Sequence, residues 1–420
     1  MVRSFYALAL GTLFSFFPYR HAVSPTPAFG GQRLAAGATA PSGFPLSNNP
    51  FAFNLLHAVL EQDPGSHNML ISPLSVYLTL SMLYNGAGHA TRDAIAQTLQ
   101  TTDIDIVRLN TLCKGLLQRM PAEDNKVQIT FANSIWYNRK RLTLLPSFES
   151  LAENYYYAPV QPLNFKGPEA AMDINRWVAR NTHKLIPAIA GTMQPDDLMY
   201  LVDAVCFNGD WKDTFVNKFN GTFNLPSGSE KLPFMGKTFP TRVFTDTSFT
   251  MVELPYGNGQ AYSMYMILPD DPQESIREFA AAFNEKKLNY ALDRMSVQST
   301  LLEMPAWEYS YSIDDMQPAL ASLGMGIAFD KENADFSNMY EGGRKNACLS
   351  KTLHKAYIKV GSTGTKAAAA TVFTLQTFGT VMQPHRIFRM IVDRPFLYVI
   401  LEKQQNLLLF AGIVEDPAKN

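Results

Sequence analysis

The stretch VGSTGTKAAAATVFTLQTFGTVMQPHRIFRMIVDRPF, residues 360–396, decides how the rest of the chain is interpreted. Its run of small residues offers a helix neither an amphipathic stripe nor a cap. With a period of two, the same residues form a strand with two distinct faces. One face carries Thr365, Ala367, Ala369, Thr371, Phe373 and Leu375, and the other carries Lys366, Ala368, Ala370, Val372, Thr374 and Gln376.

Glycines bound this stretch in the way that they bound a surface loop. Gly361 and Gly364 precede the small residues, and Gly379 follows them. The segment therefore combines the pattern of a buried strand with the boundaries of an exposed loop, and we expect it to be able to adopt both states.

The run GTKAAAAT, residues 364–371, stands between SKTLHKAYIKV and DRPFLYVI. This arrangement closely resembles the hinge of an inhibitory serpin. In that family the reactive-centre loop is bait for a protease, and after cleavage it inserts into the central sheet as a new strand. The resemblance implies a hinge made of Gly364, Thr365, Lys366, Ala367, Ala368, Ala369, Ala370 and Thr371.

A second motif of the same family lies in NMLISPLSVYLTLSMLYNGAGHAT, residues 68–91. Ser72 followed by Pro73 predicts a helix start, because serine caps a helix and proline suits its first position. The resemblance implies a polar shutter beneath the sheet, made of Ser72, Ser75, Asp203 and His354, and a breach residue, Trp211, at the upper opening of the sheet. An ordinary core helix is the alternative interpretation of residues 72–85.

The resemblance runs from about residue 50 to the end, through separated motifs in family order. It implies an α+β serpin fold: a single domain, residues 50–417, with about nine helices, three β-sheets and an exposed reactive-centre loop at about 361–390. The patterns predict strands over 127–137 and 200–215, one strand over 301–313, and a helix over 169–190. They also predict hairpins around Gly257-Asn258-Gly259 and around residues 404–406.

The composition suits a globular protein with a sizeable core. Hydrophobic residues make up 46% of the 420 residues and charged residues 17%. The net charge of −1 predicts no general attraction to nucleic acid or acidic membranes. We therefore expect no nucleic-acid partner and no membrane partner.

The amino terminus has the pattern of a secretion signal. An apolar run from Phe5 to Phe17 follows a basic residue and is short for a bilayer span. We expect a signal peptide over residues 1–24, a flexible segment over 25–49, and a secreted, extracellular protein. The sequon at Asn220 agrees with secretion. An N-terminal anchor or a buried helix is the alternative.

The residues that carry enzyme chemistry show no recognisable pattern. HExxH, CxxC and GxSxG are absent, and the seven histidines have no metal-ligand spacing. The odd cysteine count leaves at least one thiol unpaired, and Cys206 lies in an apolar run. We expect no enzyme activity, no metal, no cofactor and no essential disulfide, although a triad assembled in space is invisible in a sequence.

The family resemblance also implies a reactive bond. Inhibitory serpins place it fourteen residues after the hinge glycine, which here gives Phe378–Gly379. Phenylalanine fits the hydrophobic slot of a chymotrypsin-like protease such as chymase, cathepsin G or chymotrypsin. The loop is long, so two other bonds stay open: one after Met382 for an elastase-like or chymotrypsin-like protease, and one after Arg386 for a trypsin-like protease.

Three positions depart from the family pattern. Ser362 and Thr363 stand where many relatives have acidic residues, so a salt bridge of those relatives is missing. Asp203 replaces an asparagine, and its bond to His354 would make sheet opening depend on protonation, unless the pair is a static lock. Lys366 replaces an acidic residue on the outward face, where it should be tolerated.

We therefore expect a secreted, monomeric inhibitor that forms a covalent complex with serine proteases. A non-inhibitory serpin that acts as a carrier or chaperone is the alternative from another class. Some serpins bind heparin on a basic helix. Here the candidate basic residues are sparse, so weak heparin or glycosaminoglycan binding remains an alternative to an ordinary solvated surface; they are Arg108, Lys114, Arg119 and the cluster Arg139-Lys140-Arg141.

Overall fold

The computed structural model describes residues 49–63, 65, 68–340, 347–365 and 387–419. All of them belong to one compact unit, Ala40–Asn420. The signal peptide, nearly all of the flexible segment and most of the reactive-centre loop lie outside the described residues.

A central sheet of six strands organises the unit. Its order is β10-β11-β12-β4-β2-β3. The strands are β10 (Trp307–Ile313), β11 (Lys351–Gly361), β12 (Gly364–Thr365), β4 (Met199–Asp210), β2 (Val127–Asn138) and β3 (Val160–Leu163). The predicted strand 127–137 is confirmed, and the strand predicted at 200–215 ends at Asp210.

The other nine described strands form a second sheet, in the order β1-β15-β14-β8-β7-β6-β9-β13 with β5 beside β6. The family resemblance implied three sheets, whereas the described strands form two. The long strand β6 pairs with β5, β7 and β9, and so unites strands that were expected in two sheets. The strands are β1 (Asn68–Ile71), β15 (Leu407–Val414), β14 (Phe396–Glu402), β8 (Tyr262–Pro269), β7 (Phe249–Pro255), β6 (Gly228–Thr245), β9 (Ser296–Pro305), β13 (Phe388–Ile391) and β5 (Asn217–Leu225).

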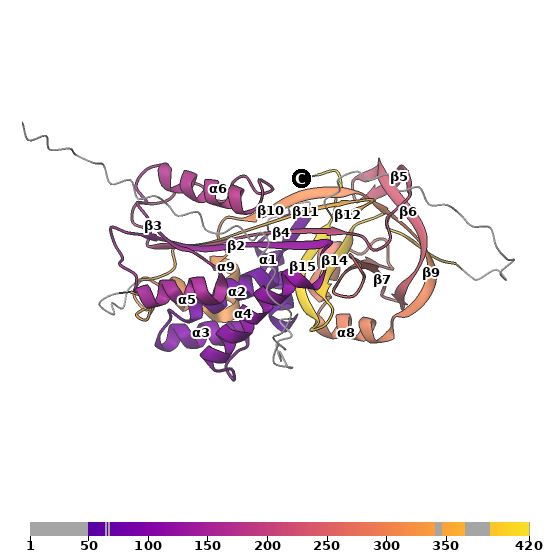
Figure 1. Ribbon diagram of the computed structural model, residues 1–420. Coiled ribbons are helices and arrows are strands. Elements are labelled where there is room, and N and C mark those ends of the chain that lie inside the picture. The colour runs from indigo at the N-terminus through magenta and orange to yellow at the C-terminus, as the bar shows by residue number, and fades with distance from the viewer. Residues whose placement is uncertain (1–48, 64, 66–67, 341–346, 366–386, 420) are drawn as a thin grey trace, which may run out of the picture. The chain divides into compact units, whose positions relative to one another are not determined.

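Helices cover both faces of the central sheet (Figure 1). Helix α6 lies on one side, over an apolar layer that includes Trp136, Ile174 and Tyr200, while α2 and α4 lie on the other. The described residues contain nine α-helices, as expected. They are α1 (Asn49–Gln62), α2 (Pro73–Tyr84), α3 (His89–Leu99), α4 (Ile106–Glu123), α5 (Pro146–Tyr156), α6 (Glu169–Asn181), α7 (Ile276–Ala282), α8 (Glu285–Arg294) and α9 (Gln317–Leu320).

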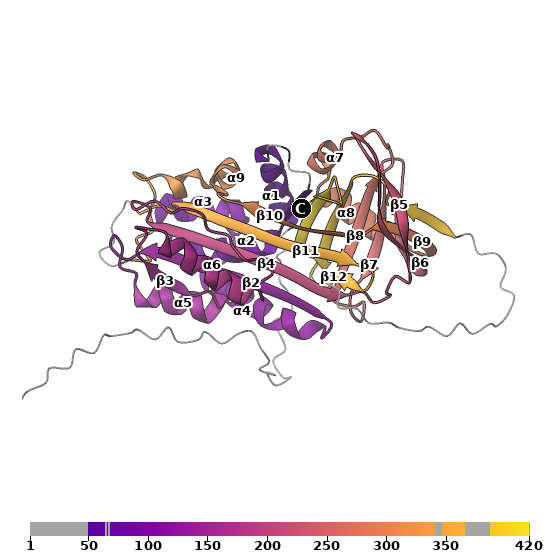
Figure 2. The same cartoon turned by 90° about the horizontal axis from the view of Figure 1, so that it is seen from above.

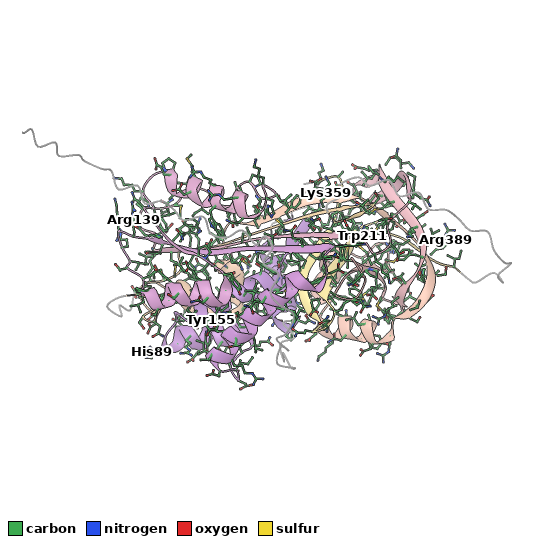
Figure 3. The ribbon with its side chains drawn as sticks, viewed as in Figure 1. His89, Arg139, Tyr155, Trp211, Lys359 and Arg389 are labelled. Carbon is green, nitrogen blue, oxygen red and sulfur yellow. The ribbon has the colours of Figure 1, made fainter. Side chains whose placement is uncertain are left out.

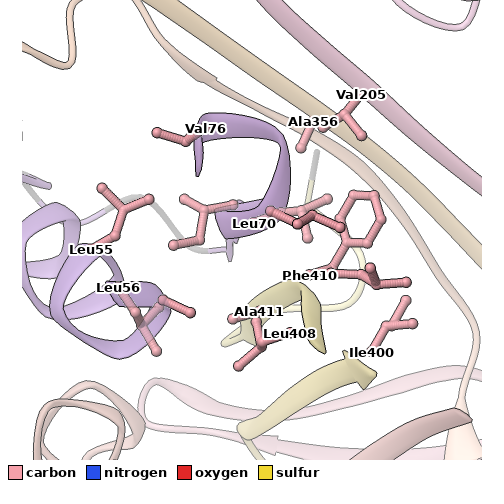
Figure 4. Close-up of a cluster of buried hydrophobic side chains, with 14 of the residues drawn as sticks. Leu55, Leu56, Leu70, Val76, Val205, Ala356, Ile400, Leu408, Phe410 and Ala411 are labelled. Atoms are coloured by element: carbon pink, nitrogen blue, oxygen red, sulfur yellow. The ribbon is translucent and has the colours of Figure 1, made fainter. Parts of the chain in front are cut away.

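The main core joins the central sheet to the second sheet through α1 and α2. Figure 4 shows Leu55 and Leu56 of α1 facing Leu408 and Ala411 of β15, with Val205 and Ala356 of the central sheet close by. All six of these side chains are fully buried. Burial of this kind contributes about 25 cal/mol per Å² of apolar surface, so the core fixes how the two sheets pack.

Local sequence explains where several elements begin and end. The Ser72 hydroxyl accepts a hydrogen bond from the Ser75 N–H at 3.4 Å, and Pro73 begins α2, as predicted. The hairpin β7–β8 turns at Gly257 and Gly259, which have φ of 57° and 80°. Left-handed backbone of this kind favours glycine.

Two predicted elements differ from the structure. The helix predicted over 169–190 ends at Asn181, because His183 and Lys184 adopt φ of 51° and 66°, which a helix cannot contain. The strand predicted over 301–313 is two strands, β9 in the second sheet and β10 in the central sheet. Pro305 ends β9, since proline has no N–H for the ladder.

Within the described ranges, no helix combines the length and the apolar character that crossing a bilayer requires.

Candidate functional site

The candidate site is the seam between β4 and β11, the two central strands that run parallel to each other. They pair directly from Tyr200 to Cys206 on β4 and from Lys351 to Tyr357 on β11. Beyond that point β12 lies between them, antiparallel to both. Figure 2 shows β4 and β11 side by side, with β12 at one end of the pair.

Only two described hinge residues occupy the gap. Gly364 pairs with Gly361 and Asp210, and Thr365 pairs with Val360 and Gly209. A Cβ atom on Gly364 would meet the Gly209 carbonyl oxygen at 2.2 Å, and its φ of 156° also favours glycine. Any side chain at position 364 would therefore push the two backbones apart.

Trp211 holds the turn that leads into β12, as the resemblance implied for a breach residue. Its indole N–H donates to the Gly361 carbonyl at 2.8 Å, and its backbone N–H donates to the Thr363 carbonyl at 2.9 Å. The Phe215 N–H donates to the Ser362 carbonyl at 2.8 Å. Figure 3 labels Trp211 at this end of the sheet. Backbone bonds thus hold residues 362 and 363, where many relatives have acidic side chains.

Thr365 is fully buried and faces Tyr256, a residue that the sequence did not reveal. The two hydroxyl oxygens lie 2.7 Å apart, and the Tyr256 ring stacks on Trp211 with centroids 4.4 Å apart. Burial raises the pKa of Tyr256 well above its ordinary value, so the hydroxyl keeps its proton and remains a hydrogen-bond donor. The sequence pattern also places Thr365 on the inward face. We call Trp211, Tyr256 and Thr365 the mouth of the seam.

The predicted shutter residues come together at the directly paired part of the seam. Asp203 and His354 are opposite partners on β4 and β11, and the His354 Nδ1 atom lies 3.1 Å from the Asp203 Oδ2 atom. The Ser75 hydroxyl donates to the other carboxylate oxygen of Asp203, and the Ser72 hydroxyl donates to the Leu409 carbonyl at 2.7 Å. These four residues, which we keep calling the shutter, are at most 1% exposed.

The hydrogen bonds of His354 determine its tautomer. The Ser72 backbone N–H lies 3.3 Å from His354 Nε2 and can only donate, so Nε2 accepts. The ring proton therefore sits on Nδ1, where it donates to Asp203. The neutral ring links α2 to β11 on one side and β11 to β4 on the other.

Asn133, on β2, extends the shutter to a third strand. Its Oδ1 atom lies 3.2 Å from the Ser75 hydroxyl oxygen, and it is the direct cross-strand partner of Asp203. The sequence did not reveal this residue, because an asparagine in an alternating strand carries no mark of its partners. Asn68, in contrast, bonds the carbonyls of Asp416 and Lys419 and belongs to the carboxyl-terminal end of the second sheet.

Other predicted residues lie elsewhere. Asn220 is exposed on β5, where a glycan would meet no obstruction from burial. Lys114 lies over the Tyr155 ring at 5.3 Å, and Arg141 pairs with Asp196. The three cysteines are buried and form no disulfide. The remaining hinge and reactive-bond predictions fall outside the described residues; they are Lys366, Ala367, Ala368, Ala369, Ala370, Thr371, Phe378, Gly379, Met382 and Arg386.

Comparison with known families decides which fold this is. The family model described as Serpin (serine protease inhibitor) matches residues 46–417, which is most of the chain. The chain belongs to the serpin family. The predicted serpin fold is thereby confirmed.

Curated relatives span nearly the whole serpin domain. Serpin-Z2A of Triticum aestivum is 31% identical over 388 residues, which cover 88% of this chain and 95% of the relative. Serpin B8 of Homo sapiens is 30% identical over 381 residues, which cover 88% of this chain and 98% of the relative. Serpins in general bind serine proteases, and most are inhibitors rather than enzymes.

Solved serpin structures share the arrangement. Tengpin, a thermophilic serpin solved in its native state, has a TM-score of 0.79 and 28% identity, with 91% of this chain and 96% of that chain covered. Thyroxine-binding globulin in complex with thyroxine has a TM-score of 0.77 and 25% identity, with 89% and 98% covered. The family therefore includes members that carry a small molecule.

Proposed function

We propose that this serpin is a secreted suicide-substrate inhibitor of chymotrypsin-like serine proteases. The observation that carries the proposal is the seam itself: a two-residue strand, β12, lies in a gap between two parallel strands that pair directly beyond it. In the proposed reaction the protease serine attacks the Phe378–Gly379 bond and forms an acyl-enzyme. The loop then inserts into the seam before water hydrolyses the ester, and carries the protease with it.

The register of β12 supports insertion along the whole seam. Thr365 pairs with Val360 and Gly209, and an antiparallel strand advances one residue as both neighbours step back by one. Six residues beyond Thr365, the growing strand therefore brings Thr371 between His354 and Asp203. A strand inserted there adds a spacing of about 4.8 Å, so the His354–Asp203 bond must break.

Residue size supports the same reaction. The inward positions that follow Thr365 in alternation are Ala367, Ala369 and Thr371. Small side chains can enter between β4 and β11 without displacing the core, and Thr371 brings a hydroxyl that can bond both shutter groups once they separate. Insertion thereby replaces the direct ladder between β4 and β11 by two ladders, one on each side of the inserted strand.

The test is incubation of the full chain with chymotrypsin, cathepsin G, elastase and trypsin, followed by denaturing gels and mass spectrometry of the released peptide. We expect a covalent complex with the first two proteases and a peptide that begins at Gly379. A peptide that begins after Met382 or Arg386 would move the reactive bond and change the protease class. Cleavage by every protease without a covalent complex would overturn the proposal.

That last outcome would favour the carrier or chaperone function. The likeness to thyroxine-binding globulin, whose structure holds thyroxine, is the observation that keeps this second function open. The small hinge residues support the inhibitor, because a carrier has no need to insert its loop quickly.

Secretion is proposed on the signal-like residues 1–24 and the exposed sequon at Asn220. Expression in a secreting eukaryotic cell should give a mature protein in the medium that begins near residue 25. Enzymatic removal of N-glycans should lower the apparent mass of the wild type and leave the Asn220→Gln variant unchanged. A protein retained in the cell with residues 1–24 still attached would contradict this part of the proposal.

A further inference from the structure

Three of the nine exposed large apolar side chains in the described residues lie on, or directly beside, two neighbouring strands of the second sheet. Val297 is 70% exposed, Ile387 is 51% exposed and Ile391 is 39% exposed. Val297 lies on β9, Ile391 ends β13, and Ile387 directly precedes β13. Single exposed apolar residues need no explanation, but a contiguous group marks an interaction surface.

The register of the two strands puts these side chains on one face. β13 runs parallel to β9, with Arg389 opposite Leu301 and Ile391 opposite Glu303. The alternate residues, Met390 and Leu302, are buried. Because side chains alternate along a strand, the other set shares the solvent side. We define the β9–β13 face as Val297, Ser299, Leu301, Glu303, Ile387, Arg389 and Ile391, of which Leu301 and Glu303 are half-buried.

Arg389 gives this face a charge. Its side chain is exposed, and it takes part in no ion pair with any other residue that the structure describes. Figure 3 labels it beside β9, at the outer edge of the sheet. An arginine fork on an apolar surface matches a partner that offers a carboxylate within an apolar surface of its own.

The position of the face indicates which partner comes near it. Ile387 is the first described residue after the segment 366–386 and follows the proposed reactive bond by nine residues or fewer. Nine residues span at most about 30 Å. A protease domain of about 200 residues has a radius of gyration of roughly 16 Å, so it is about 40 Å across. A protease seated on the reactive bond therefore has its body within reach of the face.

We propose that the β9–β13 face is an accessory docking surface for the body of the protease whose active site takes the loop. It adds contacts outside the protease active site and so selects among proteases that accept the same residue at the reactive bond. The inference rests on the proposed function. A second copy of this chain is the other occupant that an apolar face could attract, and the experiment separates the two.

The experiment measures the second-order rate constant of inhibition and the stoichiometry of inhibition for chymotrypsin and for cathepsin G. The variants are Val297→Asp, Ile391→Ser, Arg389→Glu and the conservative Arg389→Lys. Met172→Asp is the matched control, because Met172 is 56% exposed on α6, a helix that covers the central sheet. Thermal unfolding of each variant checks that the fold is intact.

We expect Val297→Asp and Arg389→Glu to lower the rate constant about tenfold with at least one of the two proteases. The loss with Arg389→Glu should shrink in high salt, because a rim charge acts mainly on the association rate. Arg389→Lys should recover part of the rate. The stoichiometry should stay at the wild-type value, since the face lies outside the seam, and Met172→Asp should match the wild type within twofold.

The outcomes are separable. A covalent complex that forms at wild-type rate in every face variant, with both proteases, would overturn the docking surface and leave the proposed function standing. No covalent complex with either protease would overturn both. Sedimentation could instead show that the wild type is a dimer and that the Val297→Asp variant is a monomer. If the two proteins then had equal inhibition rate constants, the face would be an interface between copies of this chain and the proposal would be wrong.

Discussion

The mouth and the shutter are two clusters of buried side chains along the same seam, and they differ in what lies between β4 and β11. At the shutter β4 and β11 pair directly, and His354 bonds across to Asp203. At the mouth β12 separates the strands, and Thr365 bonds instead to Tyr256, which directly follows β7. The mouth is thus already open, while the shutter still closes the seam.

This difference indicates an order of events. A strand that lengthens from β12 meets backbone that is already separated, and then has to part the direct pairs one after another. The shutter is the place where that separation also breaks buried side-chain bonds, which are costly to leave unmade. We therefore expect the first inserted residues to enter at low cost and the main barrier to insertion to lie at the shutter.

The largest effect is expected at the mouth, from Thr365→Arg. A guanidinium at this buried position would have no partner, and an unpaired buried charge costs several kcal/mol. The variant should be cleaved as a substrate and form no covalent complex on denaturing gels. Thr365→Ser and Lys366→Glu, whose position belongs to the outward face in the sequence pattern, should still trap protease. Covalent trapping by Thr365→Arg at the wild-type yield would mean that the inward face is assigned wrongly.

At the shutter, Asp203→Ala should destabilise the intact molecule by about 3 kcal/mol, because it leaves His354 with a buried unsatisfied donor and removes the acceptor of the Ser75 hydroxyl. Asp203→Asn keeps an acceptor oxygen and should cost about 1 kcal/mol. Urea unfolding of the two variants beside the wild type gives both values. Equal midpoints for Asp203→Ala and the wild type would show that the shutter does not hold the seam closed.

In the same urea measurement, loss of the hydrogen bond at the mouth should lower the free energy of unfolding by less than loss of Asp203 at the shutter. Tyr256→Phe removes one hydroxyl and leaves that of Thr365 without its partner, which costs about 1.5 kcal/mol. The double variant with Thr365→Val removes both groups and should recover part of that loss. If Tyr256→Phe cost more than Asp203→Ala, the ranking of the two clusters would be reversed.

His354 should slow the opening of the seam, because its ring supplies the side-chain bond between β11 and β4. His354→Ala removes that bond, worth about 1 kcal/mol, so loop insertion should be about fivefold faster than in the wild type. Stopped-flow fluorescence of a labelled loop would follow insertion. Equal insertion rates for the two proteins would refute the idea.

The smallest effect is expected from Glu308, which bonds Lys359 and Tyr357 of β11 on the side of that strand away from the seam. These two bonds lower the pKa of Glu308, so its contribution is present above the ordinary glutamate pKa and is lost as the pH falls through the lowered value. Both side chains of the ion pair are more than 40% exposed, and Glu308→Gln should cost less than about 0.5 kcal/mol at pH 7. A change in trapping yield would show that the outer side of β11 also controls the seam.

The sequence predicts local features of this fold well. The Ser72–Pro73 helix start and the Gly257–Gly259 hairpin follow from properties of the residues themselves, as does the inward face of Thr365. The four residues that the family motifs imply for the shutter lie in contact with one another.

Partners that meet only in three dimensions escape the sequence. Tyr256 stands 109 positions from Thr365, and Asn133 is one of many polar residues in alternating strands. The break after Pro305 is hard to see for a related reason, since both halves of that stretch have strand patterns and only their assignment to different sheets separates them.

Cys206 gives the seam a chemical reporter of its own. It pairs with Tyr357 at the last direct step of the ladder before β12, and its thiol lies buried in the apolar layer beneath α6. Since Cys206 forms no disulfide, its thiol can react with an alkylating reagent whenever β4 and β11 part far enough to admit one. With Cys113 and Cys348 replaced by serine, the rate of alkylation at Cys206 would measure how often β4 and β11 separate transiently in the intact molecule.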